Sequence, residues 1–81
     1  MRAFVLVNTI TGLEEEVLKQ LKKLRFVKEV HRVYGVYDTV VTVEFEKAED
    51  LEDVVFGGIR HMKGVQFTLT IPTVKGFNKK S

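Results

Sequence analysis

An apolar segment near the start of the chain, residues 2–8, limits the fold more than any other sequence feature. It reads Arg-Ala-Phe-Val-Leu-Val-Asn, is rich in strand-forming residues and does not alternate with polar ones, a pattern typical of a strand covered on both faces. The whole chain has 81 residues, which is one small domain that buries only about 60% of its unfolded surface. We therefore expect a central strand in a single domain that gains stability by self-association.

Composition excludes several classes of protein. With 44% hydrophobic and 30% charged residues the chain is typical of a globular domain, and it has no Cys and only two isolated histidines, so we expect no metal site and no cofactor. A net charge of +2 does not indicate a nucleic-acid surface. No apolar run approaches the roughly 20 residues of a membrane span, and no signal peptide is evident. We expect a cytoplasmic protein without membrane contact.

Two amphipathic helices follow from the spacing of apolar residues. The first has Leu13, Val17, Leu21 and Leu24 on one side, and the segment Thr11 to Glu14 before it matches a capping box. The second is expected over 48–62, with acidic residues in its first turn and an apolar stripe. That stripe consists of Leu51, Val55, Ile59 and Met62. Gly58 lies near the stripe, where it either permits close approach to the sheet or is merely tolerated.

Three further strands are expected over 27–34, 39–46 and 65–71. In the middle one, Val41, Val43 and Phe45 alternate with Val40, Thr42 and Glu44, and the first set should face helices. In the last one, Val65, Phe67, Leu69 and Ile71 alternate with Gln66, Thr68 and Thr70. The short segment Gly35 to Asp38 connects 27–34 to 39–46, which indicates a hairpin.

The order β-α-β-β-α-β predicts the ferredoxin-like α+β fold, an antiparallel four-stranded sheet ordered 4-1-3-2 with two helices on one face. Asn8, the turn 35–38 and the start of the last strand should share one end of the sheet. The face without helices should carry Val40, Thr42, Thr68 and Thr70, together with either Ala3, Val5 and Val7 or Phe4 and Leu6. Such a face is too apolar for water alone, so we expect it to pack on a second sheet in a dimeric α/β sandwich.

Catalytic and nucleic-acid functions are disfavoured by the residues present. No nucleophile, base or metal set is recognisable, which predicts that the chain is not an enzyme. An acylphosphatase-like enzyme would need an arginine in the loop after the first strand, and residues 8–12 contain none. RNA-recognition domains share the element order, but they need aromatic residues where this chain has Val40, Thr42 and Glu44.

Three segments together resemble the effector-binding domain of the Lrp/AsnC transcriptional regulators, also called the RAM domain. They are Ala3 to Val7 before Gly12, the hairpin from Val27-Lys28-Glu29-Val30 to Gly35-x-Tyr37-Asp38, and Gly64-Val65 to Thr68-x-Thr70. The resemblance covers residues 2 to about 73, so we expect a domain over 1–74 and a flexible tail over 75–81. Family members usually carry an N-terminal helix-turn-helix domain, whereas this chain starts at the first strand. It looks like a stand-alone form without direct DNA binding.

The resemblance implies a dimer formed by sheet packing, further assembly into tetramers or octamers, and a small effector, often an amino acid, bound between dimers. The matching effector-site positions here are Gly35, Val36, Tyr37, Asp38, Thr68 and Thr70. Backbone N–H groups and threonine hydroxyls would bind a carboxylate, and Asp38 would bind an ammonium group. Each position also has a structural interpretation, because Gly35 and Asp38 suit a turn, Tyr37 the edge of a core, and threonines a strand.

The sequence thus predicts a non-enzymatic effector-binding and oligomerisation module. Association with full-length Lrp/AsnC regulators through the same sheet face is a further hypothesis. The alternative is a purely structural oligomer in which the effector site is vestigial.

Overall fold

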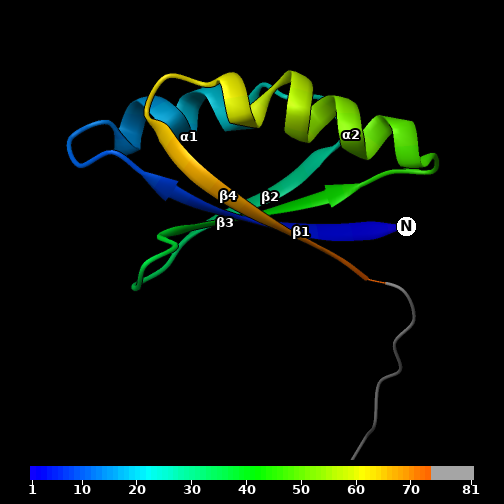
Figure 1. The fold of residues 1–81 in the computed structure, drawn as a ribbon, viewed down its shortest axis with the longest axis horizontal. Coiled ribbons are helices and arrows are strands. Elements are labelled where there is room, and N and C mark those ends of the chain that lie inside the picture. Colours follow the sequence, from blue (N-terminus) through cyan, green and yellow to red (C-terminus); the bar gives the residue numbers. More distant parts are fainter. Residues whose placement is uncertain (74–81) are drawn as a thin grey trace, which may run out of the picture.

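The computed structural model describes residues 1–73, and the expected tail over 75–81 and the domain boundary at 74 lie outside them. Its elements, in chain order, are β1 (Arg2–Thr9), α1 (Glu14–Lys22), β2 (Val27–Arg32), β3 (Thr39–Glu44), α2 (Ala48–Gly57), a 3₁₀ turn η1 (Ile59–His61) and β4 (Val65–Pro72). The four strands form one antiparallel sheet ordered β2-β3-β1-β4. Both helices cover the same face of that sheet (Figure 1). The predicted ferredoxin-like fold is confirmed, with β1 in the interior of the sheet.

Strand register decides which side chains of β1 face the helices. Val5 lies opposite Val41 on β3, and Leu6 lies opposite Val40. Residues paired in this way point to the same face, and Val5 and Val41 are fully buried whereas Leu6 and Val40 are half-buried. Ala3, Val5 and Val7 therefore belong to the helix face, and Phe4 and Leu6 to the face without helices, which we call the open face.

The last strand forms as predicted, but the predicted face of its threonines is wrong. Thr68 and Thr70 pair with Val7 and Val5, so both threonines lie on the helix face rather than on the open face. Phe67, Leu69 and Ile71 take the open face instead, with 46%, 46% and 45% of their surfaces exposed.

A β-bulge at the start of β4 causes this reversal. Asn8 pairs with Phe67 while Thr9, the next residue, pairs with Val65, so Gln66 is an extra residue in the ladder. An extra residue shifts the alternation of side chains by one position. Val65 still packs against the core, but every later apolar residue of the strand points to the opposite face from Val65.

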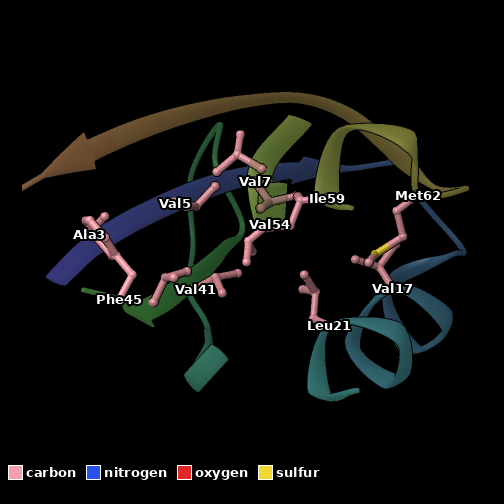
Figure 2. Packing of buried hydrophobic residues seen from close by; sticks show 12 residues of the cluster. Ala3, Val5, Val7, Val17, Leu21, Val41, Phe45, Val54, Ile59 and Met62 are labelled. Carbon is pink, nitrogen blue, oxygen red and sulfur yellow. The ribbon is translucent and has the colours of Figure 1, made fainter. Parts of the chain in front are cut away.

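The core lies between the helices and the helix face of the sheet (Figure 2). Val17 and Leu21 of α1 and Val54 and Val55 of α2 are buried there, together with Ile59 and Met62 after α2. The predicted stripes are thus confirmed at their central positions, Val17, Leu21, Val55 and Ile59. None of the helices in residues 1–73 is long and apolar enough to span a membrane.

Both predicted helices differ from the observed ones at one end. The first begins at Glu14, and no side chain caps it, so the predicted capping box is wrong. Instead, the Gly12 N–H donates to Glu14 Oε1 at 2.8 Å, and Gly12 has a φ of +96°, a conformation that only glycine adopts readily.

The second helix ends at Gly57 rather than at Met62, since the chain turns at Gly58 into η1. A Cβ on Gly58 would lie 2.7 Å from the Val54 carbonyl oxygen and 3.4 Å from Leu24 Cδ2. The interpretation that Gly58 permits close approach is therefore confirmed. The segment that approaches it is the end of α1, at Leu24, rather than the sheet.

Candidate functional site

The turn from Gly35 to Asp38 is fastened to the end of β1. The Val33 N–H donates to the Asp38 carbonyl at 2.9 Å, and the Asp38 N–H donates to the Val7 carbonyl at 3.0 Å. Gly35 has a φ of +136°, which a residue with a Cβ adopts only with strain. The sequence expectation that this turn lies beside the end of the first strand is confirmed.

The Asp38 carboxylate is already bound within the chain. Its Oδ1 accepts a hydrogen bond from the Thr9 N–H at 3.1 Å, and its Oδ2 accepts one from the Thr9 hydroxyl. This pair holds the turn against β1, which is the structural interpretation of Asp38. A carboxylate accepts several hydrogen bonds at once, so these contacts leave lone pairs for a further donor. The sequence analysis missed Thr9, because only the fold brings it to Asp38.

Asn8 is a second residue at this site that the sequence analysis did not single out as a ligand contact. Its side-chain N–H donates to the Val36 carbonyl, while its Oδ1 is buried without a hydrogen-bond partner among the described residues. A buried acceptor left unpaired costs free energy. The Asn8 Oδ1 is therefore available as an acceptor beside the turn.

Tyr37 joins the turn to the open face. Its ring meets the Phe67 ring edge to face, with centroids 5.6 Å apart and planes at 83°. Aromatic pairs favour this geometry. Val36 is 69% exposed, so Tyr37 is held at the rim of the open face while its neighbour faces solvent.

Thr68 and Thr70 lie in a different place. Both line a groove of about 430 Å³ between β4 and α2, together with Phe56 and Arg60. The Arg60 guanidinium stacks over the Phe56 ring, 5.0 Å from its centroid. No residue of the turn lines this groove. The structure thus brings Gly35, Val36, Tyr37 and Asp38 together but keeps the two threonines apart from them.

Charged side chains on the open face form two ion pairs. Arg2 contacts Glu44 at 2.6 Å, and the His31 Nε2 lies 2.8 Å from Glu29 Oε1. The hydrogen bond from Arg2 lowers the pKa of Glu44 below its usual value of 4.5. Within residues 1–73 no three His, Asp or Glu side chains gather in a way that would hold a metal ion.

Comparison with known families identifies the chain. The family model of the Lrp/AsnC ligand binding domain matches residues 2–79, nearly the full length of the sequence. The chain belongs to this family, so the resemblance seen in the sequence is confirmed, and the protein is an effector-binding domain by class. The comparison with curated proteins returned no significant match.

Solved structures agree with this assignment. TTHA0845 from Thermus thermophilus is 32% identical with a TM-score of 0.90, and the alignment covers 96% of this chain and 98% of that one. PHS023, a hypothetical protein from Pyrococcus horikoshii, is 37% identical with a TM-score of 0.83 and coverage of 93% and 90%. The regulator NMB0573 from Neisseria meningitidis, solved in complex with L-Met, shares the fold at 17% identity and a TM-score of 0.86. That alignment covers 99% of this chain but 53% of the regulator.

Proposed function

We propose that this chain is a non-enzymatic module that self-associates through its open face and binds an amino acid between copies. The observation that carries the proposal is the open face itself. Its apolar residues form a continuous surface over three adjacent strands. They are Phe4, Leu6, Val40, Phe67, Leu69 and Ile71.

This apolar surface is more stable in contact with a second copy of the chain than in contact with water. Phe67, Leu69 and Ile71 are each nearly half exposed, and contiguous apolar patches of this kind mark interaction sites. Two identical faces related by a twofold axis bury the same patch on both chains. Sheets packed face to face stand about 10 Å apart, which leaves room for the side chains of both faces to interdigitate.

The separation of the candidate contacts favours a ligand held between copies. Tyr37 lies on the open-face side against Phe67, whereas Thr68, the next residue along β4, points toward the helices. One small ligand is therefore not surrounded by the turn and the threonines of a single chain. In an assembly, the turn of one copy and the threonines of another can meet around it.

An amino acid matches the polar groups near the turn. The Asp38 carboxylate and the Asn8 Oδ1 are acceptors for its ammonium group, and the threonine hydroxyls of another copy are donors for its carboxylate. Hydrogen bonds to charged groups contribute about 1.5–3 kcal/mol each. The structural neighbour NMB0573 was solved with L-Met, which supports the same class of effector here.

The proposed mechanism is a shift between assemblies. A ligand that contacts two copies stabilises the assembly that holds both, and it shifts the equilibrium by no more than its difference in affinity for the two states. Tetramers or octamers built from dimers would provide such sites. Full-length Lrp/AsnC regulators, which carry the same domain, are candidate partners through the open face.

A purely structural oligomer is the second candidate. This candidate is favoured by the Asp38 carboxylate, which already accepts two hydrogen bonds from Thr9. In that case the turn only fastens the hairpin to β1, and no amino acid changes the assembly.

Light scattering and thermal unfolding, measured with each common amino acid in turn, separate the two candidates. We expect one or a few amino acids to change the assembly size and raise the melting temperature. Tyr37→Ala should weaken that response, whereas Tyr34→Ala is the matched control, because Tyr34 is fully exposed. If every amino acid leaves both measurements unchanged, the effector function is wrong and the structural oligomer remains. A particle of only 9.3 kDa at micromolar concentration would contradict both.

A further inference from the structure

The groove between β4 and α2 is lined by hydrogen-bond donors and one cation. Its polar lining consists of Arg60, Gln66, Thr68 and Thr70, and no Asp or Glu of the described residues lines it. Its volume of about 430 Å³ lies within the range of about 300–1,000 Å³ that is usual for small-molecule sites. The groove thus carries a single positive charge without a compensating negative one, which favours a small anion.

The cation of this groove is held in place but has no acidic partner. The Arg60 guanidinium lies over the Phe56 ring, 5.0 Å from its centroid, and this contact restricts where the side chain can go. Arg60 forms no ion pair within residues 1–73. A guanidinium has five N–H donors in a fixed plane, so Arg60 retains donors for a ligand.

Two hydroxyl groups lie on the other side of the groove. The bulge at the start of β4 turns Thr68 and Thr70 toward the helices, where both are half-buried. The threonine hydroxyls that form hydrogen bonds within residues 1–73 are those of Thr9, Thr39 and Thr73. The hydroxyls of Thr68 and Thr70 are therefore available to a ligand in the groove.

The rest of the groove is apolar, which distinguishes between kinds of anion. Val55, Phe56 and Val65 line it, and Phe56 is 53% exposed. A phosphate group carries about 1.5–2 negative charges at neutral pH, more than one guanidinium neutralises, and it has no apolar part. A carboxylate carries one negative charge and accepts two parallel hydrogen bonds from a guanidinium. The lining therefore favours a carboxylate attached to a short apolar chain.

We propose that this groove binds the carboxylate of a small organic acid, with Arg60 as the counter-ion and the hydroxyls of Thr68 and Thr70 as further donors. The inference deepens the proposed function, because an amino acid between copies would place its carboxylate in the groove of one chain and its ammonium group at Asp38 of another. It rests on the proposed function only for the ligand being an amino acid. The carboxylate site itself lies within one chain.

An NMR titration with isovalerate tests the carboxylate site. Isovalerate has a carboxylate and a branched apolar chain but no ammonium group, so it does not need Asp38. We expect it to shift the backbone amide signals of Thr68 and Thr70 until they saturate. Isovaleramide has the same shape without the charge, and it should bind about tenfold more weakly or worse, as expected for the loss of hydrogen bonds to a charged group.

Two outcomes of this titration would overturn the proposal. If isovalerate leaves the Thr68 and Thr70 signals unchanged, or if isovaleramide binds equally well, the groove does not recognise a carboxylate. Inorganic phosphate is the second probe, and it should bind more weakly than isovalerate. Tighter binding of phosphate would mean that the groove is a phosphate site instead.

Arginine variants test the counter-ion. Arg60→Gln should weaken isovalerate binding about tenfold or more, and Arg60→Lys should retain part of the affinity, because it keeps the charge but not the paired donors. Arg25→Gln is the matched control, since Arg25 lies over the Phe26 ring at the same 5.0 Å but lines a different cleft. Arg60 is exposed, so its replacement leaves the core intact. Equal affinity in Arg60→Gln and Arg25→Gln would show that Arg60 is not the counter-ion.

Light scattering with amino acids separates this inference from the proposed function. If isovalerate binds in the groove but no amino acid changes the assembly, the effector function is wrong and the carboxylate site stands. If an amino acid changes the assembly of Arg60→Gln at the same concentration as that of the unaltered chain, the effector function stands and the inference about Arg60 is wrong. We expect Arg60→Gln to need about tenfold more amino acid or more.

Discussion

The two faces of the sheet are built from alternate residues of the same strands, yet they are covered differently. On the helix face, Val5 and Val41 are fully buried beneath side chains of α1 and α2. On the open face, Leu69 of β4 remains 46% exposed, although it is as apolar as its buried counterparts. Residues 1–73 contain no element that covers this second face (Figure 1).

The comparison teaches that apolar character alone does not indicate where a core lies. One face obtains its cover from helices of the same chain, so its packing is independent of protein concentration. Under the proposed self-association, the other face is covered by a second molecule, so its burial would depend on concentration and on anything that changes assembly. Regulation by an effector is physically reasonable at the second face and not at the first.

The largest expected effect is on the helix face. Leu21→Ala removes a fully buried side chain and should lower the free energy of unfolding by about 2–5 kcal/mol. Urea denaturation measures this loss. Leu69→Ala is the matched change on the open face, and at concentrations where the protein is monomeric it should cost much less. Equal losses would mean that both faces are covered within one chain.

The next largest effect is on assembly. Leu69→Asp places a charge in the middle of the open face and should weaken self-association about a hundredfold, or about 2.8 kcal/mol. Sedimentation velocity over a range of concentrations measures the change. Gln66→Asp adds the same charge at the bulge, beside the groove on the helix side, and should leave association unchanged. If both variants associate like the unaltered chain, the open face is not the interface.

A smaller effect is expected where the turn meets β1. Asp38→Ala removes the acceptor of the Thr9 N–H and hydroxyl and should destabilise the fold by about 1–3 kcal/mol, because it leaves donors unsatisfied. Asp38→Asn keeps one acceptor oxygen and should cost less. Thermal unfolding of the two variants side by side tests this order. An Ala variant as stable as the unaltered chain would show that Asp38 does not fasten the turn.

The smallest effect concerns the ion pair at the rim of the open face. The hydrogen bond from Arg2 lowers the pKa of Glu44 below its usual value of 4.5. The pair therefore contributes its stability above the unfolded-state pKa, and that contribution is lost as the pH falls through the lower folded-state pKa. Both side chains are about half exposed, so the contribution is small. The melting temperatures of the unaltered chain and Glu44→Gln should converge on acidification; a constant difference would exclude this linkage.

Much of the fold could be predicted from the sequence because local patterns determine it. Val17 and Leu21 lie one helical turn apart on a buried face, and Val41 and Val43 alternate with half-buried or polar neighbours in a strand. The order of elements then leaves few ways to pair four strands. The end of β1, the turn and the start of β4 were correctly placed at one end of the sheet for the same reason.

The candidate site could be predicted only in part. The turn from Gly35 to Asp38 is contiguous in the sequence, and the structure keeps it together at the end of β1. The topology placed Asn8 beside this turn, but the hydrogen bonds from Asn8 and Thr9 to the turn were not predicted, since nothing in the local sequence indicates partners 28 and 29 residues away. Whether Gly35, Val36, Tyr37, Asp38, Thr68 and Thr70 contact an effector stays a prediction.

The sequence by itself determined that this chain forms strands and helices in the ferredoxin-like order. The spacing of apolar residues within each short segment indicates whether that segment is a helix or a strand. Only the tertiary structure decided which face each side chain of β4 occupies. The extra residue at Gln66 becomes visible only when Asn8 and Thr9 are paired with their partners on β4. A bulge is a property of two strands together, so one strand read alone predicted the wrong face for Thr68 and Thr70.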